Sequence, residues 1–178
     1  MEKFISQSNL EQFYKKEIFI KGKKGVNEQI QKIQTDGSKH TRSIFLSHSH
    51  LDKTIVNKIS LLFSSLNIDM YIDWLDKSLP EQTDRNTAEA IKSKIYETNH
   101  FLFLATYHGL RSKWCNWELG IADSLKNSKK LAILPIETKS GNWSGNEYLC
   151  LYPEMRFENE NLDNLDVKKL KYTKLMAK

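Results

Sequence analysis

The chain has 178 residues, 39% of them hydrophobic, which is enough for one folded domain with a core of its own. Its formal net charge is +5, and no apolar run approaches the roughly 18 residues that a membrane helix needs. The N-terminus lacks the features of a signal peptide, and two cysteines are too few for a disulfide framework. We therefore expect a cytoplasmic protein without a membrane partner.

The first 42 residues form a basic segment, with nine Lys or Arg against five Asp or Glu. The spacing of their apolar residues predicts one or two helices over 8–34, and "TDGSKH" at 35–40 is typical of a linker. A basic arm of this kind can attract phosphates or anionic lipid heads. No aromatic residues interleave with a long basic stripe, so we interpret the lysines as a solvated surface and expect no nucleic-acid partner.

Four short apolar runs predict strands, because they are rich in β-forming residues and bounded by turn or cap residues. A weaker fifth run is "EMRFE". The strong runs are "SIFLS" (43–47), "DMYID" (69–73), "FLFLA" (101–105) and "LAILPI" (131–136). Helical spacing fills the segments between them, and strands that alternate with helices indicate a parallel sheet. We expect a doubly wound α/β domain of about five strands over residues 43–158.

The C-terminal segment, residues 159–178, begins acidic and ends basic. This charge order is favourable for a helix dipole, so we expect a C-terminal helix there. The sequence thus predicts three parts: a basic helical extension with a linker (1–42), the α/β domain (43–158) and the terminal helix (159–178).

The loops after the strands are the places to look for a site, because open parallel sheets bind ligands at the carboxyl ends of their strands. The chain has no glycine-rich phosphate loop and no G-x-G-x-x-G after the first strand. His48 and His50 have no matching carboxylate or thiolate cluster in the sequence, so we expect no metal. Ser47 and His48 are adjacent on an extended segment and point to opposite faces, which disfavours a nucleophile and base pair.

Glu118 is an anomaly in the helix expected over 112–130. At about 100° per residue it falls within a stripe formed by Trp114, Trp117, Ile121, Ala122 and Leu125. A carboxylate walled by indole rings is costly unless a polar or cationic group faces it. The residues alone leave two interpretations open: an acid that meets a bound cation, or a structural acid paired with a base such as Arg111.

Four segments in order carry a family resemblance: "IFLSHSHLDK", "YIDW", "SKWCNWELGIA" and "LAILPI". Over residues 43–136 the chain resembles bacterial TIR (Toll/interleukin-1 receptor) domains, including the TIR component of Thoeris-like antiphage systems. The resemblance implies a flavodoxin-like fold and cleavage of the nicotinamide–ribose bond of NAD+, giving ADP-ribose or a cyclic isomer. It also implies that NAD+ is a substrate, that no further cofactor is needed, and that a nucleotide messenger could activate a separate effector.

The resemblance also implies roles for individual residues. It makes Glu118 the catalytic acid and matches Trp114 to an aromatic residue one turn before that acid. The positions of Ser47, His48, Asp73 and Trp74 at the ends of the first two strands predict that they also lie at the substrate, although Ser47 could instead cap the next helix and Trp74 could simply pack under the loop. In the family, the loop after the second strand mediates contacts between TIR domains that assemble on activation, which here implicates Lys77, Leu79 and Pro80. Pro80 is followed by Glu81 in place of the family's frequent Pro-Gly pair.

Two other functions remain open at this point. The first is a non-catalytic TIR adapter that acts through assembly alone. The second is a nucleoside-processing enzyme on a related sheet, which would also use a carboxylate near ribose.

Overall fold

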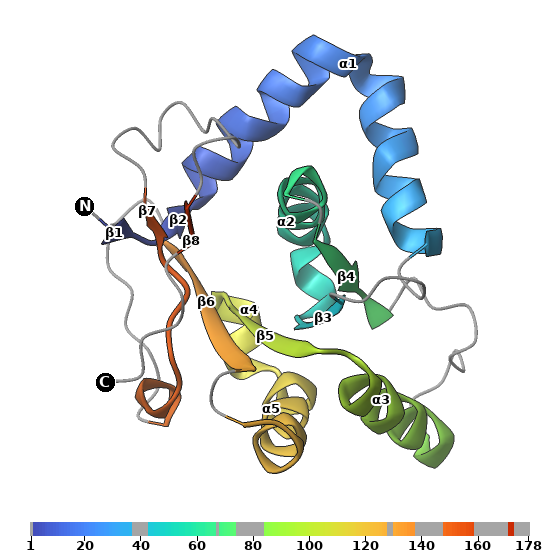
Figure 1. Ribbon diagram of the computed structural model, residues 1–178, viewed down its shortest axis with the longest axis vertical. Helices are drawn as coiled ribbons and strands as arrows, with labels where there is room; N and C mark the ends of the chain where they lie inside the picture. The colour runs from blue at the N-terminus through green and yellow to red at the C-terminus, as the bar shows by residue number, and fades with distance from the viewer. Residues whose placement is uncertain are drawn as a thin grey trace.

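The computed structural model describes residues 2–36, 43–66, 68–73, 84–127, 130–137, 148–158 and 171–172. Its main feature is a five-stranded parallel sheet in the order β2-β6-β5-β3-β4 (Figure 1). The strands are β2 (Ile5–Ser6), β3 (Ser43–Ser47), β4 (Asp69–Tyr71), β5 (His100–Ala105) and β6 (Leu131–Glu137). The four strong apolar runs therefore form strands as predicted, within an α/β fold.

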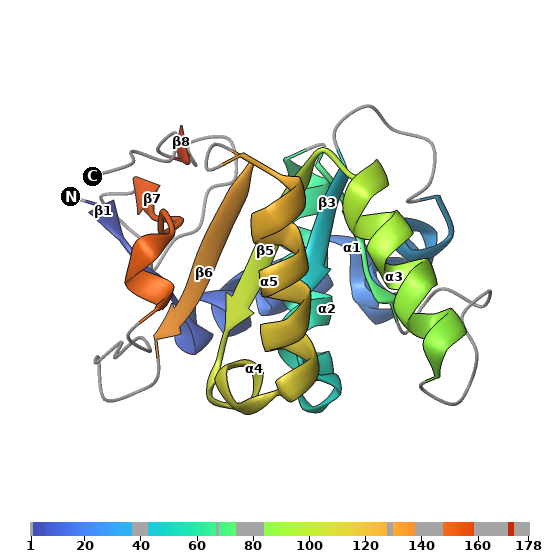
Figure 2. The ribbon, with the colours of Figure 1, turned by 90° about the horizontal axis from the view of Figure 1, so that it is seen from below.

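Helices cover both faces of this sheet, as Figure 2 shows. α1 (Gln7–Asp36) and α2 (Lys53–Ser65) lie on one face, and α3 (Arg85–Glu97) and α5 (Lys113–Leu125) lie on the other. The short helix α4 (Tyr107–Arg111) follows β5 at the carboxyl edge, and two 3-10 turns, η1 (His50–Asp52) and η3 (Leu149–Leu151), complete the described helical elements.

The core has two halves because side chains alternate along each strand. In β3, Ile44 and Leu46 pack against the α1 and α2 side, whereas Phe45 packs against the α3 and α5 side. Both halves are closely filled with aliphatic and aromatic side chains that are almost fully buried. Burial on both faces explains why the central strands are apolar along nearly their whole length.

The helix α1 is bent at Gly22, and its two arms lie around α2 in Figure 1. Gly22 has φ 73° and ψ 158°, a backbone conformation that essentially only glycine adopts. The bend allows the first arm to bury Leu10 and Phe13 and the second arm to bury Val26 and Ile30. The helical prediction for 8–34 is confirmed, with this break inside it.

The edge of the sheet differs from the prediction. The fifth strand is β2, which comes from the N-terminal segment and pairs with β6, so the segment 1–42 is not a separate extension. The predicted fifth strand, "EMRFE", makes a single bridge to β6 at Glu154, and its end forms β7 (Phe157–Glu158) beside β1 (Glu2–Lys3). An edge strand such as β6 has backbone groups that need partners. Here β2 from the N-terminal segment and Glu154 from the segment before β7 each pair with part of β6.

The predicted C-terminal helix is wrong where the structure describes it. Lys171–Tyr172 forms β8, which pairs antiparallel with β7 in a small three-stranded sheet. A favourable charge order contributes little to a helix, and backbone pairing with a neighbouring strand outweighs it here. The rest of 159–178 lies outside the described residues. Across the described part of the chain, no helix is both long and apolar enough to span a membrane.

Candidate active site

Glu118 lies above the carboxyl end of β3. Strand alternation directs Ser47 to the same face as Phe45, which is the face that α5 covers. α5 begins where the Ser112 hydroxyl accepts a hydrogen bond from the Cys115 N–H at 3.2 Å, a regular N-cap. One turn later, Glu118 projects toward Ser47.

The buried face of α5 is shifted from the predicted stripe. It consists of Cys115, Glu118, Leu119 and Ala122, whereas Leu125 is 46% exposed. Trp114, Trp117 and Ile121 are partly buried and pack at the border of the core. Glu118 therefore lies in the middle of the buried face of α5. A helical side chain covers the surface over the turn before its own Cα, which explains why the buried face is shifted from the predicted stripe.

Glu118 is paired with a hydroxyl and not with the base considered from the sequence. The Ser47 hydroxyl donates to Oε2 of Glu118 at 2.6 Å. The guanidinium of Arg111 instead lies over the Tyr107 ring, 3.8 Å from its centroid. The interpretation of Glu118 as an acid satisfied by Arg111 is therefore wrong.

The environment of Glu118 holds a proton on it. The residue is only 2% exposed, and its pKa is raised to about 8, mainly by burial. The negative charge of Asp73 contributes to this rise, while hydrogen bonds from Ser47 and Trp114 oppose it. A buried acid with a strongly raised pKa is a feature of functional sites, because a nearby positive charge can ionise it.

A second cluster of polar side chains surrounds Asp73, which follows β4. Nε2 of His48 lies 3.3 Å from Oδ1 of Asp73, and Nε2 of His50 lies 4.0 Å from Oδ2. Nδ1 of His48 lies 2.7 Å from the carbonyl oxygen of Leu46. The sequence singled out each of these three polar residues, but it did not predict that one carboxylate joins the two histidines.

The indole of Trp114 donates a hydrogen bond to Glu118, and its ring centroid lies 4.8 Å from that of Trp117. Cys115 is no nucleophile, since burial raises the pKa of its thiol to about 12. Within the described ranges, no three His, Cys, Asp or Glu side chains form a metal-like cluster.

Part of the predicted site cannot be placed. Trp74, Lys77, Leu79 and Pro80 lie outside the described residues, so their roles stay predictions. Of the other predicted site residues, the structure brings Ser47, Trp114 and Asp73 into the environment of Glu118. His48 contacts Asp73.

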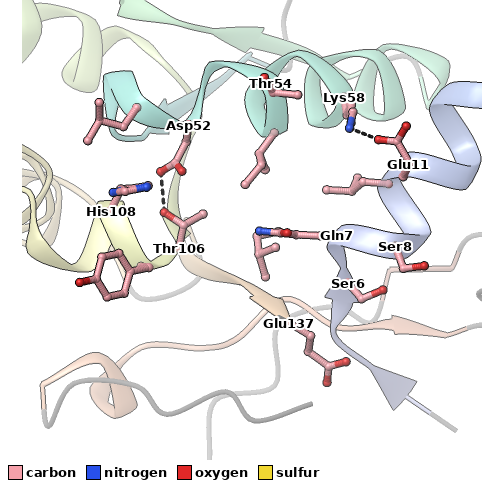
Figure 3. A pocket seen from close by; sticks show the side chains of 15 residues that line it. Ser6, Gln7, Ser8, Glu11, Asp52, Thr54, Lys58, Thr106, His108 and Glu137 are labelled. Atoms are coloured by element: carbon pink, nitrogen blue, oxygen red, sulfur yellow. Dashed lines mark hydrogen bonds and ion pairs between the residues drawn. The ribbon is translucent and has the colours of Figure 1, made fainter. Parts of the chain in front are cut away.

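A cavity of about 930 Å³ opens at the same edge of the sheet but on the α1 and α2 face (Figure 3). Its charged lining residues are Glu11, Asp52, Lys58 and Glu137, and Lys58 is paired with Glu11. Neither Ser47 nor Glu118 lines it. Three carboxylates against one paired lysine are unfavourable for a pyrophosphate, so we assign the candidate active site to Glu118 and not to this cavity.

One wall of the cavity contains a buried link between the ends of β3 and β5. The Thr106 hydroxyl donates to Oδ2 of Asp52 at 2.5 Å (Figure 3). The same hydroxyl accepts from the Gly109 N–H at 2.9 Å. Asp52 and Thr106 are both buried. The sequence indicated Asp52 only as a helix-terminal charge. Asp52 follows β3 and Thr106 follows β5, and these two strands are neighbours in the sheet. This shared location at the carboxyl edge is the signal from which the link could have been predicted.

We expect Thr106→Val to destabilise the fold by about 2 to 4 kcal/mol, because it leaves the Asp52 carboxylate and the Gly109 N–H buried without this hydroxyl. Thr106→Ser keeps the hydroxyl and should cost about 1 kcal/mol or less. Urea denaturation followed by circular dichroism measures both. Equal losses in the two variants would show that the hydroxyl contributes nothing.

Comparison with known proteins agrees with this geometry. A parallel five-stranded sheet with helices on both faces and an acid at its carboxyl edge defines a doubly wound α/β protein. A family model described as a TIR domain matches residues 44–165. The chain belongs to the TIR-domain family.

Two curated relatives are similar in sequence. The "Probable 3' cyclic ADP-D-ribose synthase ThsB'" of Bacillus cereus (strain MSX-D12) is 34% identical over 114 residues, which cover 62% of this chain and 58% of that protein. The "Putative cyclic ADP-D-ribose synthase TIR2" of Cytobacillus dafuensis is 30% identical over 91 residues, which cover 49% of this chain and 24% of that protein. The match thus spans less than two thirds of either relative.

Proposed function

We propose that this protein cleaves the nicotinamide–ribose bond of NAD+ and releases nicotinamide together with a cyclic ADP-ribose isomer. The observation that carries the proposal is the buried Glu118 carboxyl, with its pKa raised to about 8, held by Ser47 at the carboxyl end of β3. The two relatives, both named as cyclic ADP-D-ribose synthases, support the choice of substrate and product.

The chemistry needs one acid of this kind. The bond from C1′ of the ribose to the cationic nicotinamide breaks with its electron pair moving to the ring nitrogen, so nicotinamide leaves neutral and requires no proton. Positive charge develops on the ribose, and the ionised Glu118 stabilises it, as carboxylates do in glycosidases. The cationic ring of bound NAD+ favours this ionisation by lowering the pKa of Glu118.

The second step decides the product. A hydroxyl of the same ADP-ribosyl group attacks C1′ and loses its proton to give a cyclic isomer, whereas attack by water gives ADP-ribose. The aromatic side chain of Trp114 supports the first outcome, because a flat apolar wall beside Glu118 restricts water and holds the ring system in place.

Access to Glu118 requires movement, because only 2% of the residue is exposed. This burial supports a further part of the proposal: the protein is nearly inactive alone and becomes active when TIR domains assemble. The nucleotide product then acts as a signal in antiphage defence. The partners are then other copies of the chain and an effector that binds the messenger.

The test is incubation of the purified protein with NAD+ at low and high protein concentration, followed by chromatography and mass spectrometry. We expect nicotinamide release per molecule to increase at least several-fold with concentration, and a product lighter than ADP-ribose by one water. Equal amounts of nicotinamide and free ADP-ribose would show hydrolysis instead of cyclisation.

The non-catalytic adapter is the second candidate, and the burial of Glu118 is the observation that favours it. An adapter would assemble at high concentration without releasing nicotinamide. Light scattering on the same samples separates this result from simple failure to assemble.

A further inference from the structure

The bend of α1 forms a projecting corner of the molecule, which we call the apex and define as residues 15–24. Figure 1 shows the apex at the top of the view, beyond α2 and far from α5. The corner exists because the two arms of α1 meet at an angle at Gly22. A projecting corner of this kind can touch a surface much larger than the molecule.

Two adjacent apolar side chains of the apex are exposed to water. Phe19 is 91% exposed and Ile20 is 61% exposed. Among the large hydrophobic residues in the described part of the chain, Phe19 is the most exposed. Single exposed apolar residues are common on protein surfaces, so this pair is informative only through its surroundings.

Those surroundings are strongly basic. Residues 15–24 contain five lysines and one glutamate, a net charge of +4 in a chain whose total is +5. Two of the lysines precede Phe19 by four and three residues, so they share its face of the helix. All five lysines are exposed: Lys15, Lys16, Lys21, Lys23 and Lys24.

Much of this positive charge is not neutralised by acidic side chains. Lys21 pairs with Glu17 at 2.5 Å, and Lys24 lies 3.8 Å from the exposed Glu28. The lysines of the apex that form no ion pair with any other described residue are Lys15, Lys16 and Lys23. The charge of these lysines is therefore available to an anionic partner.

Charge and shape together select the kind of partner. A second copy of the chain would set lysines against lysines. A folded acidic protein fits poorly, because a stable interface takes roughly 800 Å² from each partner and the apex offers two apolar side chains on a convex corner. A nucleic acid would use the lysines but leave Ile20 in water. An anionic bilayer fits both features, since its phosphates attract lysines and its acyl chains accept apolar side chains.

We propose that the apex binds the surface of an anionic lipid bilayer, with Phe19 and Ile20 inserted among the acyl chains and the lysines at the phosphate headgroups. The apolar stems of the lysines can lie beside this pair while their ammonium groups stay at the headgroups. Glu118 lies across the sheet from α1, so the bound protein keeps its candidate active site away from the bilayer.

This proposal departs from the sequence-based expectation of a solvated basic surface without a membrane partner. It is independent of the proposed function, because membrane binding is measured without NAD+. Failure of the protein to cleave NAD+ would leave the tests below unaffected.

The first test is sedimentation of the full chain with lipid vesicles. One set contains phosphatidylglycerol and phosphatidylcholine in equal parts, and the other contains phosphatidylcholine alone. We expect binding to the anionic set to be stronger by a factor of roughly ten or more and to weaken as salt is added. Equal binding to both sets, or no binding to the anionic set, would overturn the proposal.

The second test removes charge from the apex. Lys16→Gln combined with Lys23→Gln should weaken binding to the anionic vesicles by a factor of roughly 25, since each lysine near an anionic surface contributes about fivefold. The matched control, Lys113→Gln with Lys130→Gln, removes the same charge from exposed positions outside the apex and should change binding by about twofold or less. An equal loss in the control would show that total charge and not the apex determines binding.

The third test concerns insertion. Phe19→Gln should weaken binding by a factor of roughly ten or more, whereas Leu151→Gln, at a position of η3 that is 76% exposed, should leave it unchanged. Both positions are exposed, so both variants should fold. Tryptophan fluorescence of Phe19→Trp should be quenched by brominated acyl chains more than that of the wild type. Full binding by Phe19→Gln, or equal quenching of the two proteins, would contradict insertion.

Discussion

Glu118→Gln is expected to reduce nicotinamide release by a factor of roughly 10² to 10⁴, measured as kcat/KM with NAD+. The amide keeps the shape of the carboxyl group and can still accept a hydrogen bond from Ser47. It cannot acquire the negative charge that stabilises the ribose as the bond to nicotinamide breaks. The loss should therefore appear in the chemical step, with little change in the folded structure.

The matched control is Glu89→Gln, the same substitution at an exposed position of α3. It should leave the rate within about twofold of the wild type. A Glu118→Gln variant that keeps more than a tenth of the wild-type rate would remove Glu118 from the mechanism. The source of the activity would then have to be sought among the other polar residues at the carboxyl edge.

The second large effect is on stability and depends on pH. Burial raises the pKa of Glu118 to about 8 in the folded protein, against 4.5 for the exposed group. The folded state therefore binds more protons than the unfolded state between these values, and the wild type loses stability as pH rises from 4.5 to 8. The full loss corresponds to about 5 kcal/mol, and roughly 3 kcal/mol of it is present at pH 7.

Glu118→Gln removes this dependence because glutamine does not titrate. We expect the difference in unfolding free energy between variant and wild type to increase in favour of the variant as pH rises, by several kcal/mol up to pH 8. Urea denaturation at closely spaced pH values measures it, and subtraction of the two curves cancels groups that titrate equally in both. A constant difference from pH 5 to 8 would mean that Glu118 is already ionised in the folded protein.

The two effects have one cause. The same burial that keeps Glu118 protonated in the free protein makes its ionised form costly, and a bound cationic ring offsets part of that cost. If the residue at this position served stability alone, a neutral side chain would give a higher free energy of unfolding near neutral pH than Glu118 does. The combination of lost activity and increased alkaline stability in one variant would therefore distinguish a catalytic acid from a structural one.

The sequence by itself determined the architecture of the domain. Runs such as "FLFLA" and "LAILPI" are apolar on both faces, which suits only central parallel strands, and the helical spacing between runs required crossovers. The parallel arrangement expected for these strands then directed attention to the loops at their carboxyl ends. Ser47 and Glu118 were both predicted as site residues, and the structure places them in contact.

Local patterns predicted the chain ends less well. β2 has only two residues and β8 only two, and segments this short carry no periodic signal. Each exists because an already formed strand, β6 or β7, has backbone groups to pair. Such pairing depends on which segments the fold brings together, and not on the residues of the short strand.

Only the tertiary structure decided the partners within the site. Helical spacing put Glu118 among apolar residues but could not say whether Arg111 or a residue 71 positions away would face it. The same holds for the carboxylate of Asp73 between His48 and His50, and for the link from Asp52 to Thr106. Contacts between distant residues depend on strand register and helix position to within an ångström or two, and hydrogen bonds and pKa values are set at that scale.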